Sequence, residues 1–194
     1  MSRTASIRRT TRETEVAVTV DLDGEGRAEV HTGIGFLDHL LTSLAHHALF
    51  DLEVRTSGDL EVDDHHTVED TALVLGQAIA EALGDRAGIA RFGDAAVPMD
   101  EALARAAVDA GGRPYAVIDL ALRNERIGAL TAQNLPHALE TLARTAGMTV
   151  HLEASGRNDH HVAEAAFKAL ARALRAAVSP DGRRRGVPST KGTV

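Results

Sequence analysis

Short stretches of the chain alternate hydrophobic and polar residues, and longer stretches repeat their hydrophobic residues at helical spacing. In residues 15–22, Val16, Val18 and Val20 alternate with polar or small neighbours, which is typical of a half-buried strand. The turn residues at 23–26 follow and predict a hairpin to the next strand. The same criteria predict strands over residues 15–22, 28–30, 49–55, 103–108, 115–120 and 149–152. They predict helices over residues 36–47, 133–146 and 159–177, and a fourth that runs from a cap at Asp63 or Asp64 to about Leu83.

The two halves of the chain repeat one pattern, which indicates an internal duplication. The segment 64–69, Asp-His-His-Thr-Val-Glu, returns at 159–164 as Asp-His-His-Val-Ala-Glu, and each copy has a further histidine upstream, His39 or His137. Chance reuse of aspartate as a helix cap is the alternative, but a histidine, a strand and the motif matched in the same order favour duplication. Each half has the order β-β-α-β-α, and we place the halves at residues 1–92 and 93–180, with a tail at 181–194.

Composition narrows the class of protein. The chain has 194 residues, 25% of them charged and 44% hydrophobic, as expected of an ordinary globular protein. A net charge of −7 and 3% aromatic residues argue against a nucleic-acid partner. No apolar run approaches the roughly 20 residues that span a bilayer, and residues 1–9 lack the hydrophobic stretch of a signal peptide. We therefore expect no membrane partner and a cytoplasmic location. The absence of cysteine excludes disulfides, thiolate zinc sites and a cysteine nucleophile.

Ten histidines are the unusual feature, and they include adjacent pairs at 65–66 and 160–161. Residues four apart on a helix differ by about 40° in direction, so His65 and Glu69 share a face. The same holds for His160 and Glu164. Adjacent histidines diverge and would serve different ions, so the pattern predicts two metal sites to which each helix contributes. The predicted ligands are His39, His65, His66, Glu69, His137, His160, His161 and Glu164.

The ligand set leaves the metal open, because imidazole suits Zn, Cu, Fe and Ni while carboxylate adds affinity for Mn. Asp38, Asp64 and Asp159 lie beside the histidines, either as their hydrogen-bond partners or as helix caps, and the cap is the favoured interpretation for Asp64 and Asp159. The other histidines gain no such support and are interpreted as structural or surface residues: His31, His46, His47 and His151.

A second signal points to an anionic ligand. Arg91 and Arg113 follow glycine-containing turns, and the tail contains Lys191 between Ser189-Thr190 and Gly192. Arginine binds phosphate as a fork and lysine as a point charge, and the flanking hydroxyl and backbone groups would add donors. The chain lacks a G-x-x-x-x-G-K-[ST] segment, so nucleoside triphosphate chemistry is not indicated.

Taken together, these motifs resemble the imidazoleglycerol-phosphate dehydratase family of histidine biosynthesis. The resemblance covers nearly the whole chain and rests on residues 33–39, 63–70, 91–94, 112–115, 159–168 and 188–192. It implies an α+β fold of two fused β-β-α-β-α half-domains, each a small sheet backed by helices, as in domain 2 of ribosomal protein S5. It also implies a monofunctional enzyme, because the chain has no room for a histidinol-phosphatase domain, and a homo-oligomeric cage of 24 subunits built from trimers, with active sites at subunit interfaces.

The family resemblance also assigns roles to residues. The enzymes dehydrate D-erythro-imidazole-glycerol phosphate, a small phosphate substrate, to imidazole-acetol phosphate with two Mn²⁺ per active site, and the eight predicted ligands match the family's metal ligands. Glu164 is expected to take the carbon proton, with Glu13 or Glu69 at the departing hydroxyl. The residues implied to contact substrate are Glu13, His39, His47, Arg91, Arg113, Ser189 and Lys191. For His47 this replaces the interpretation as a structural or surface residue.

Two other classes of function use the same ligands. A binuclear metallohydrolase would activate water with them and release inorganic phosphate from an ester. A metal-buffering protein would bind ions without catalysis. The conjunction of the metal ligands with Arg91, Arg113 and Lys191 argues against the buffering protein, because storage needs no phosphate-binding residues.

Overall fold

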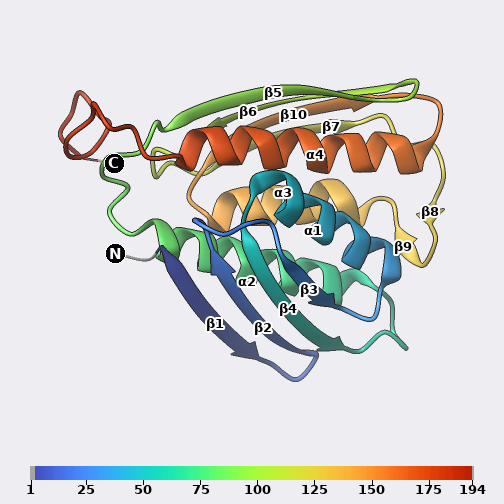
Figure 1. The fold of residues 1–194 in the computed structure, drawn as a ribbon. Helices are drawn as coiled ribbons and strands as arrows, with labels where there is room; N and C mark the ends of the chain where they lie inside the picture. The colour runs from blue at the N-terminus through green and yellow to red at the C-terminus, as the bar shows by residue number, and fades with distance from the viewer. Residues whose placement is uncertain (1–2, 194) are drawn as a thin grey trace.

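The computed structural model describes residues 3–193 as two four-stranded sheets with a layer of four helices between them (Figure 1). Met1 and Ser2, of the N-terminal stretch 1–9, and Val194, of the predicted tail 181–194, lie outside the described residues. Within the described chain, no helix combines the length and apolar character needed to cross a membrane.

The first half contributes one mixed sheet and two helices. The sheet has the order β1-β2-β4-β3, in which β3 runs parallel to β4 and the other pairs are antiparallel. Its elements are β1 (Thr4–Thr10), β2 (Thr14–Asp21), β3 (Ala28–His31), α1 (Gly35–Ala48), β4 (Asp51–Gly58) and α2 (His65–Leu83).

The second half repeats this plan with the order β5-β6-β10-β7, in which β7 is parallel to β10. It also carries a small two-stranded excursion, β8 and β9, at the end of the molecule away from the tail (Figure 1). Its elements are β5 (Phe92–Met99), β6 (Ala102–Asp109), β7 (Tyr115–Leu120), β8 (Arg126–Ile127), β9 (Leu130–Thr131), α3 (Asn134–Thr145), β10 (Thr149–Ser155) and α4 (Asp159–Val178). The α+β class and the duplication are confirmed, and each half has one further strand at its start, β1 or β5.

The predicted hairpin between β2 and β3 is wrong, because β4 lies between these strands. The loop at 24–27 crosses the start of β4, where the Asp51 carboxylate accepts hydrogen bonds from Glu25 N at 2.8 Å and Arg27 N at 3.0 Å. These bonds fix the loop across the end of the neighbouring strand, so β3 enters the sheet on the far side of β4. Glycine residues in this loop therefore mark a crossover rather than a two-strand turn.

The helices pair across the two halves, α1 with α4 and α2 with α3. The second pair packs closely at Gly76 of α2, where an added Cβ would lie 2.7 Å from the Leu142 carbonyl oxygen of α3. Burial of leucine, isoleucine and alanine side chains between the sheets joins the two halves into one core. Any site formed within a helix pair therefore draws residues from both halves.

Candidate metal centre

The structure forms two clusters of metal-ligating side chains at the N-terminal ends of the helix pairs. We call His39, His160 and Glu164 the α1–α4 cluster, and His65, Glu69 and His137 the α2–α3 cluster. In each cluster one ligand atom per residue lies within 4.8 Å of the other two. Two nitrogens and a carboxylate oxygen at such spacing suit a divalent transition metal.

In the α1–α4 cluster, Glu164 Oε2 lies 3.0 Å from His39 Nε2 and 3.1 Å from His160 Nε2. Its other oxygen, Oε1, forms an ion pair with Lys168 Nζ at 2.6 Å. Lys168 lies one helical turn further along α4. Burial by itself would raise the pKa of Glu164, but hydrogen bonds from Lys168 and His39 outweigh it and hold the pKa at about 2. The carboxylate is therefore ionised at neutral pH and held in place by its own helix.

In the α2–α3 cluster, Glu69 lies between His65 and His137. Its Oε1 is 3.2 Å from His137 Nε2, and its Oε2 is 3.7 Å from His65 Nε2. Asn134 Oδ1 lies 3.2 Å from His65 Nδ1, which leaves Nε2 of that ring facing the cluster. His137 Nε2 is buried and makes no hydrogen bond to any residue in the range 3–193. A buried nitrogen that makes no hydrogen bond, with a carboxylate oxygen beside it, suits a metal ion placed between the two.

The second histidine of each pair lies outside both clusters. His66 Nδ1 contacts the Asp59 carboxylate at 3.0 Å, and His161 Nδ1 contacts Glu101 Oε2 at 2.9 Å. These hydrogen bonds raise the pKa of both histidines. Six of the eight predicted ligands are thus gathered by one chain, three in each cluster. His66 and His161 complete neither cluster within that chain.

Asp64 and Asp159 do not cap their helices with their side chains, so that prediction is wrong. The preceding residues accept these bonds instead: Asp63 Oδ1, the alternative predicted cap, accepts from His65 N at 2.7 Å, and Asn158 Oδ1 accepts from His160 N at 2.9 Å. This frees both aspartates to hold the β8–β9 excursion at its two ends.

The excursion is fixed by direct hydrogen bonds to these aspartates. The Asp64 carboxylate accepts from Thr131 N and Oγ1, both at 2.6 Å, while Asp159 Oδ2 accepts from Arg123 N at 3.0 Å and Asn124 N at 2.7 Å. The third aspartate, Asp38, accepts from Thr32 N and Oγ1 and fixes the loop before α1.

The residues expected to bind phosphate lie at the other end of the fold, around a cavity of about 340 Å³ lined by Arg91, Gly111, Arg113, Ser189, Thr190, Lys191 and Thr193. Arg91 is not free there: it donates to both Asp109 oxygens, at 2.7 and 2.9 Å, and to the Pro188 carbonyl oxygen at 2.7 Å. Arg113 and Lys191 are exposed. Arg91 therefore holds the tail in place, while Arg113 and Lys191 remain available to an anion.

This anion site and the metal clusters are far apart in one chain. Helix α4 has 20 residues, so it spans about 30 Å between His160 at its start and the tail that follows it. Figure 1 shows the tail and the β8–β9 excursion at opposite ends of the molecule. A small phosphate ester cannot bridge that distance within a single subunit.

Two further predicted residues lie apart from the clusters. Burial lowers the pKa of His47, near the end of α1, and the positive charges of His46, Lys168 and Arg172 lower it further. Glu13, in the turn between β1 and β2, places Oε1 3.9 Å from His66 Nε2 with its side chain 54% exposed. Both residues are accessible to a ligand, but neither joins a metal cluster.

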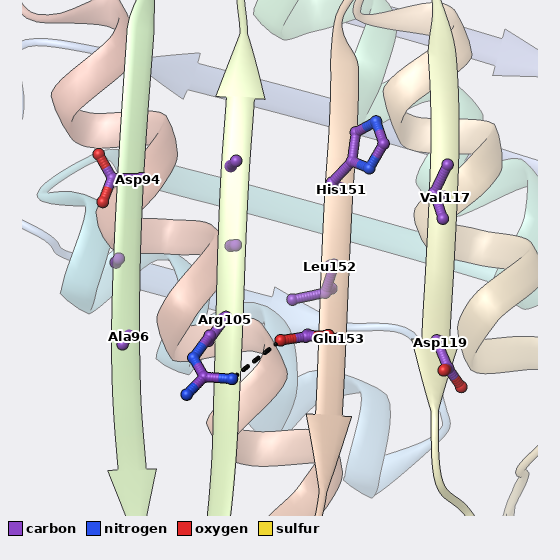
Figure 2. Close-up of a pocket in the computed structure, with 11 residues that line it drawn as sticks. Asp94, Ala96, Arg105, Val117, Asp119, His151, Leu152 and Glu153 are labelled. Carbon is purple, nitrogen blue, oxygen red and sulfur yellow. Dashed lines mark hydrogen bonds and ion pairs between the residues drawn. The ribbon is translucent and has the colours of Figure 1, made fainter.

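A hollow of about 460 Å³ on the outer face of the second sheet also has charged side chains in its lining, but none of the groups of metal-ligating atoms found among the described residues lies there (Figure 2). Its one ion pair joins Arg105 and Glu153 at 3.1 Å, and both side chains are largely exposed. None of the predicted site residues lines it. The helix ends and the tail therefore remain the candidate site.

Four side chains with a polar atom within 3.2 Å of the side chain of a predicted ligand were not expected from the sequence: those of Asp59, Glu101, Asn134 and Lys168. Lys168 follows Glu164 by one helical turn, so helical spacing could have revealed it. The other three come from loops or from a different helix, and no local pattern relates them to the histidines that they contact.

Comparisons with known proteins support one family. The family model for imidazoleglycerol-phosphate dehydratase matches residues 32–174. The protein of that name from Acidiphilium cryptum is 55% identical over 196 residues, covering 100% of each chain. The one from Methanothermobacter thermautotrophicus is 55% identical over 184 residues, covering 95% of this chain and 94% of that protein.

Two solved structures of proteins with this name are also similar. The Staphylococcus aureus structure has a TM-score of 0.82 and 33% identity, covering 91% of this chain and 99% of its own. The Pyrococcus furiosus structure has a TM-score of 0.83 and 37% identity, covering 97% of this chain and 100% of its own.

Proposed function

The chain belongs to the imidazoleglycerol-phosphate dehydratase family of hydro-lyases, and we propose that it removes water from D-erythro-imidazole-glycerol phosphate in a manganese-dependent step of histidine biosynthesis in the cytoplasm. The observation that carries the metal dependence is the pair of matching clusters, each with two imidazoles and one carboxylate. The product is imidazole-acetol phosphate, and two Mn²⁺ serve each active site.

The chain's carboxylates supply the proton transfers. The residues of the two clusters would hold manganese, which would supply Lewis-acid stabilisation of negative charge on the substrate's imidazole and so favour loss of the neighbouring hydroxyl. Glu13 or Glu69 takes the N–H proton of the substrate's imidazole and passes it to this hydroxyl, which leaves as water when the C–O bond breaks. Glu164, ionised at neutral pH, then takes the proton from the adjacent carbon, and the resulting enol ketonises.

The phosphate group is held by cations of the tail region. Arg113 and Lys191 are exposed at the anion site, and Ser189 adds a hydroxyl beside them. Arg91 acts through the tail, because it bonds the Pro188 carbonyl oxygen next to Ser189. These interactions fix the substrate by its non-reacting end and leave the imidazole for the metal ligands.

We further propose that the active site is assembled from more than one subunit. The anion site and the metal clusters are separated by about the length of α4, and His66 and His161 complete neither cluster of their own chain. A neighbouring copy of the chain that brings its tail or its second histidines to a cluster would account for both the separation and the incomplete clusters. The family resemblance suggests the cage of 24 subunits built from trimers, which native mass spectrometry would test.

The decisive experiment is turnover by metal-stripped protein before and after addition of Mn²⁺, following the enolised ketone product in alkali. Ketone formed only after Mn²⁺ is restored is the expected result. Release of inorganic phosphate from the substrate would instead indicate the metallohydrolase, and Mn²⁺ binding with no reaction would indicate the metal-buffering protein.

A further inference from the structure

The second histidine of each pair is held by a carboxylate that comes from outside its helix. Asp59, in the loop after β4, contacts His66 Nδ1 through Oδ2 at 3.0 Å and Oδ1 at 3.2 Å. Glu101, in the turn between β5 and β6, contacts His161 Nδ1 through Oε2 at 2.9 Å. The two halves thus make the same contact with carboxylates from different loops.

These contacts determine which ring nitrogen carries the proton. An ionised carboxylate can only accept a hydrogen bond, so Nδ1 of each ring must be the donor. In the neutral imidazole the free lone pair is then on Nε2, which is the atom that can bind a metal ion. A carboxylate on the far nitrogen is the usual outer partner of a metal-bound histidine.

We propose that Asp59 and Glu101 are positioning residues, which hold His66 and His161 in the tautomer and orientation needed to ligate manganese. This inference rests on the proposed function, because it takes the second histidines as ligands. The two carboxylates touch neither substrate nor metal themselves, and act through the histidine rings.

Comparison of the two halves shows that equivalent turn glutamates make different contacts. Glu13 and Glu101 hold the same place, immediately before the second strand of each half, since β2 begins at Thr14 and β6 at Ala102. Glu101 forms a hydrogen bond with His161. In the first half Asp59 holds the histidine instead, which leaves Glu13 with an exposed carboxylate 3.9 Å from the metal-binding nitrogen of His66. One turn glutamate therefore positions a ligand, and its counterpart remains free to meet the substrate. In the second half the neighbouring Asp100 places Oδ2 3.9 Å from His161 Nε2, so an exposed carboxylate lies beside this nitrogen in both halves.

The two carboxylates differ in their other contacts. Glu101 Oε1 accepts hydrogen bonds from Arg157 N at 2.9 Å and Asn158 N at 2.8 Å, so both its oxygens are used. In the described part of the chain, His66 is the sole hydrogen-bond donor to the Asp59 side chain. The amide analogues of the two residues should therefore behave differently.

Glu101→Gln has one oxygen for two backbone N–H groups, so its NH₂ group faces His161 Nδ1. That nitrogen must then accept, and the ring proton moves to Nε2, which removes the metal-binding lone pair. Asp59→Asn has no competing donor and can turn its oxygen to Nδ1–H, so the tautomer is kept. The same chemical change should thus damage one site and spare the other.

The test is titration of metal-stripped full-length variants with Mn²⁺, with thermal unfolding as the check on folding. We expect Glu101→Gln to weaken Mn²⁺ binding by about 10–100-fold at an unchanged melting temperature, and Asp59→Ala to weaken it similarly. Asp59→Asn should restore binding to within about 3-fold of the unsubstituted protein, because the hydrogen bond to Nδ1 is kept. Glu153→Gln, which alters an exposed ion pair on the outer sheet, is the matched control.

Two results would overturn the inference. One is Mn²⁺ binding by Glu101→Gln equal to that of the unsubstituted protein, and the other is Asp59→Asn binding as weakly as Asp59→Ala. Failure of the proposed function gives a different result, since the unsubstituted protein would then bind no Mn²⁺ or would bind it without forming ketone.

Discussion

The two metal clusters use the same ligand types in different surroundings. Glu69 of the α2–α3 cluster has a side chain 31% exposed, whereas Glu164 of the α1–α4 cluster is 10% exposed and paired with Lys168. The position on α2 that corresponds to Lys168 is Leu73, which packs against the core. The two copies thus share their predicted ligands but not their electrostatic environment, so we expect the two clusters to differ in their effect on the reaction.

The largest expected difference is between Glu164→Ala and Glu69→Ala. Loss of Glu164 should lower kcat by about 10²–10⁴-fold, because it removes the proposed base, while KM changes much less. Glu69→Ala should lower kcat by a smaller factor, about 10–10²-fold, if another carboxylate shares its role. Steady-state kinetics at saturating Mn²⁺ measures both.

The metal content of these variants is the necessary control, since each also loses a ligand. Both proteins should be fully loaded, as shown by elemental analysis, before rates are compared. A kcat near normal in fully loaded Glu164→Ala would contradict the assignment, and equal losses in the two variants would remove the distinction between the clusters.

A smaller effect is expected from Lys168→Met, which removes the feature that distinguishes the α1–α4 cluster. The hydrogen bond from Lys168 Nζ to Glu164 Oε1 holds the carboxylate, and such charge-assisted bonds contribute about 1.5–3 kcal/mol. We expect kcat to fall by about 10-fold, which corresponds to about 1.4 kcal/mol. Arg175 is exposed on the same helix, and Arg175→Met should leave kcat unchanged. An equal fall in kcat for Arg175→Met would show that the loss of any positive charge on α4 lowers the rate.

The smallest effect concerns the tail, which only the second half possesses. The hydrogen bond from Arg91, stronger than the opposing effect of burial, lowers the pKa of Asp109. Because the folded pKa is depressed, the pair's stabilisation is complete above the unfolded pKa of about 3.9 and is lost as pH falls through the lower folded value. Tail protection from hydrogen exchange should therefore be constant from about pH 5 to 8.

Asp109→Asn should remove the stabilisation by the Arg91–Asp109 pair even at neutral pH. We expect hydrogen exchange of the tail to become about 5–30-fold faster, which corresponds to a loss of about 1–2 kcal/mol in the free energy of opening the tail. Asp51→Asn removes a comparable pair with Arg27 in the first half, far from the tail, and should leave tail exchange unchanged. A pH dependence between about pH 5 and 8 in the unsubstituted protein would show that another group holds the tail.

Local patterns predicted the elements whose side chains alternate clearly, such as β2, but not β1. Of the seven residues of β1 only Ala5 is buried, because the strand lies at the sheet edge with polar residues on its outer face. Strand order also escaped prediction: β4 separates β2 from β3 through contacts between residues distant in sequence. Periodicity records which face is buried, and not which neighbour buries it.

The same limit applies to the site. Helical spacing predicted that His65 and Glu69 would share a face, and likewise His160 and Glu164, and the structure places each pair in one cluster. It could not predict which upstream histidine joins which helix, since that depends on the pairing of α1 with α4 and of α2 with α3. The loop carboxylates of Asp59 and Glu101 were missed for the same reason.

The pairing of helices across the halves has an evolutionary consequence. His39 belongs to the first half and His137 to the second, yet each sits with the paired histidine and glutamate of the other half. A single ancestral half could therefore have formed neither cluster alone, and would have needed a second copy of itself in a symmetric dimer with two identical sites. In the fused chain this symmetry is no longer required, and the two sites differ: Lys168 lies beside one cluster and Leu73 holds the corresponding position near the other.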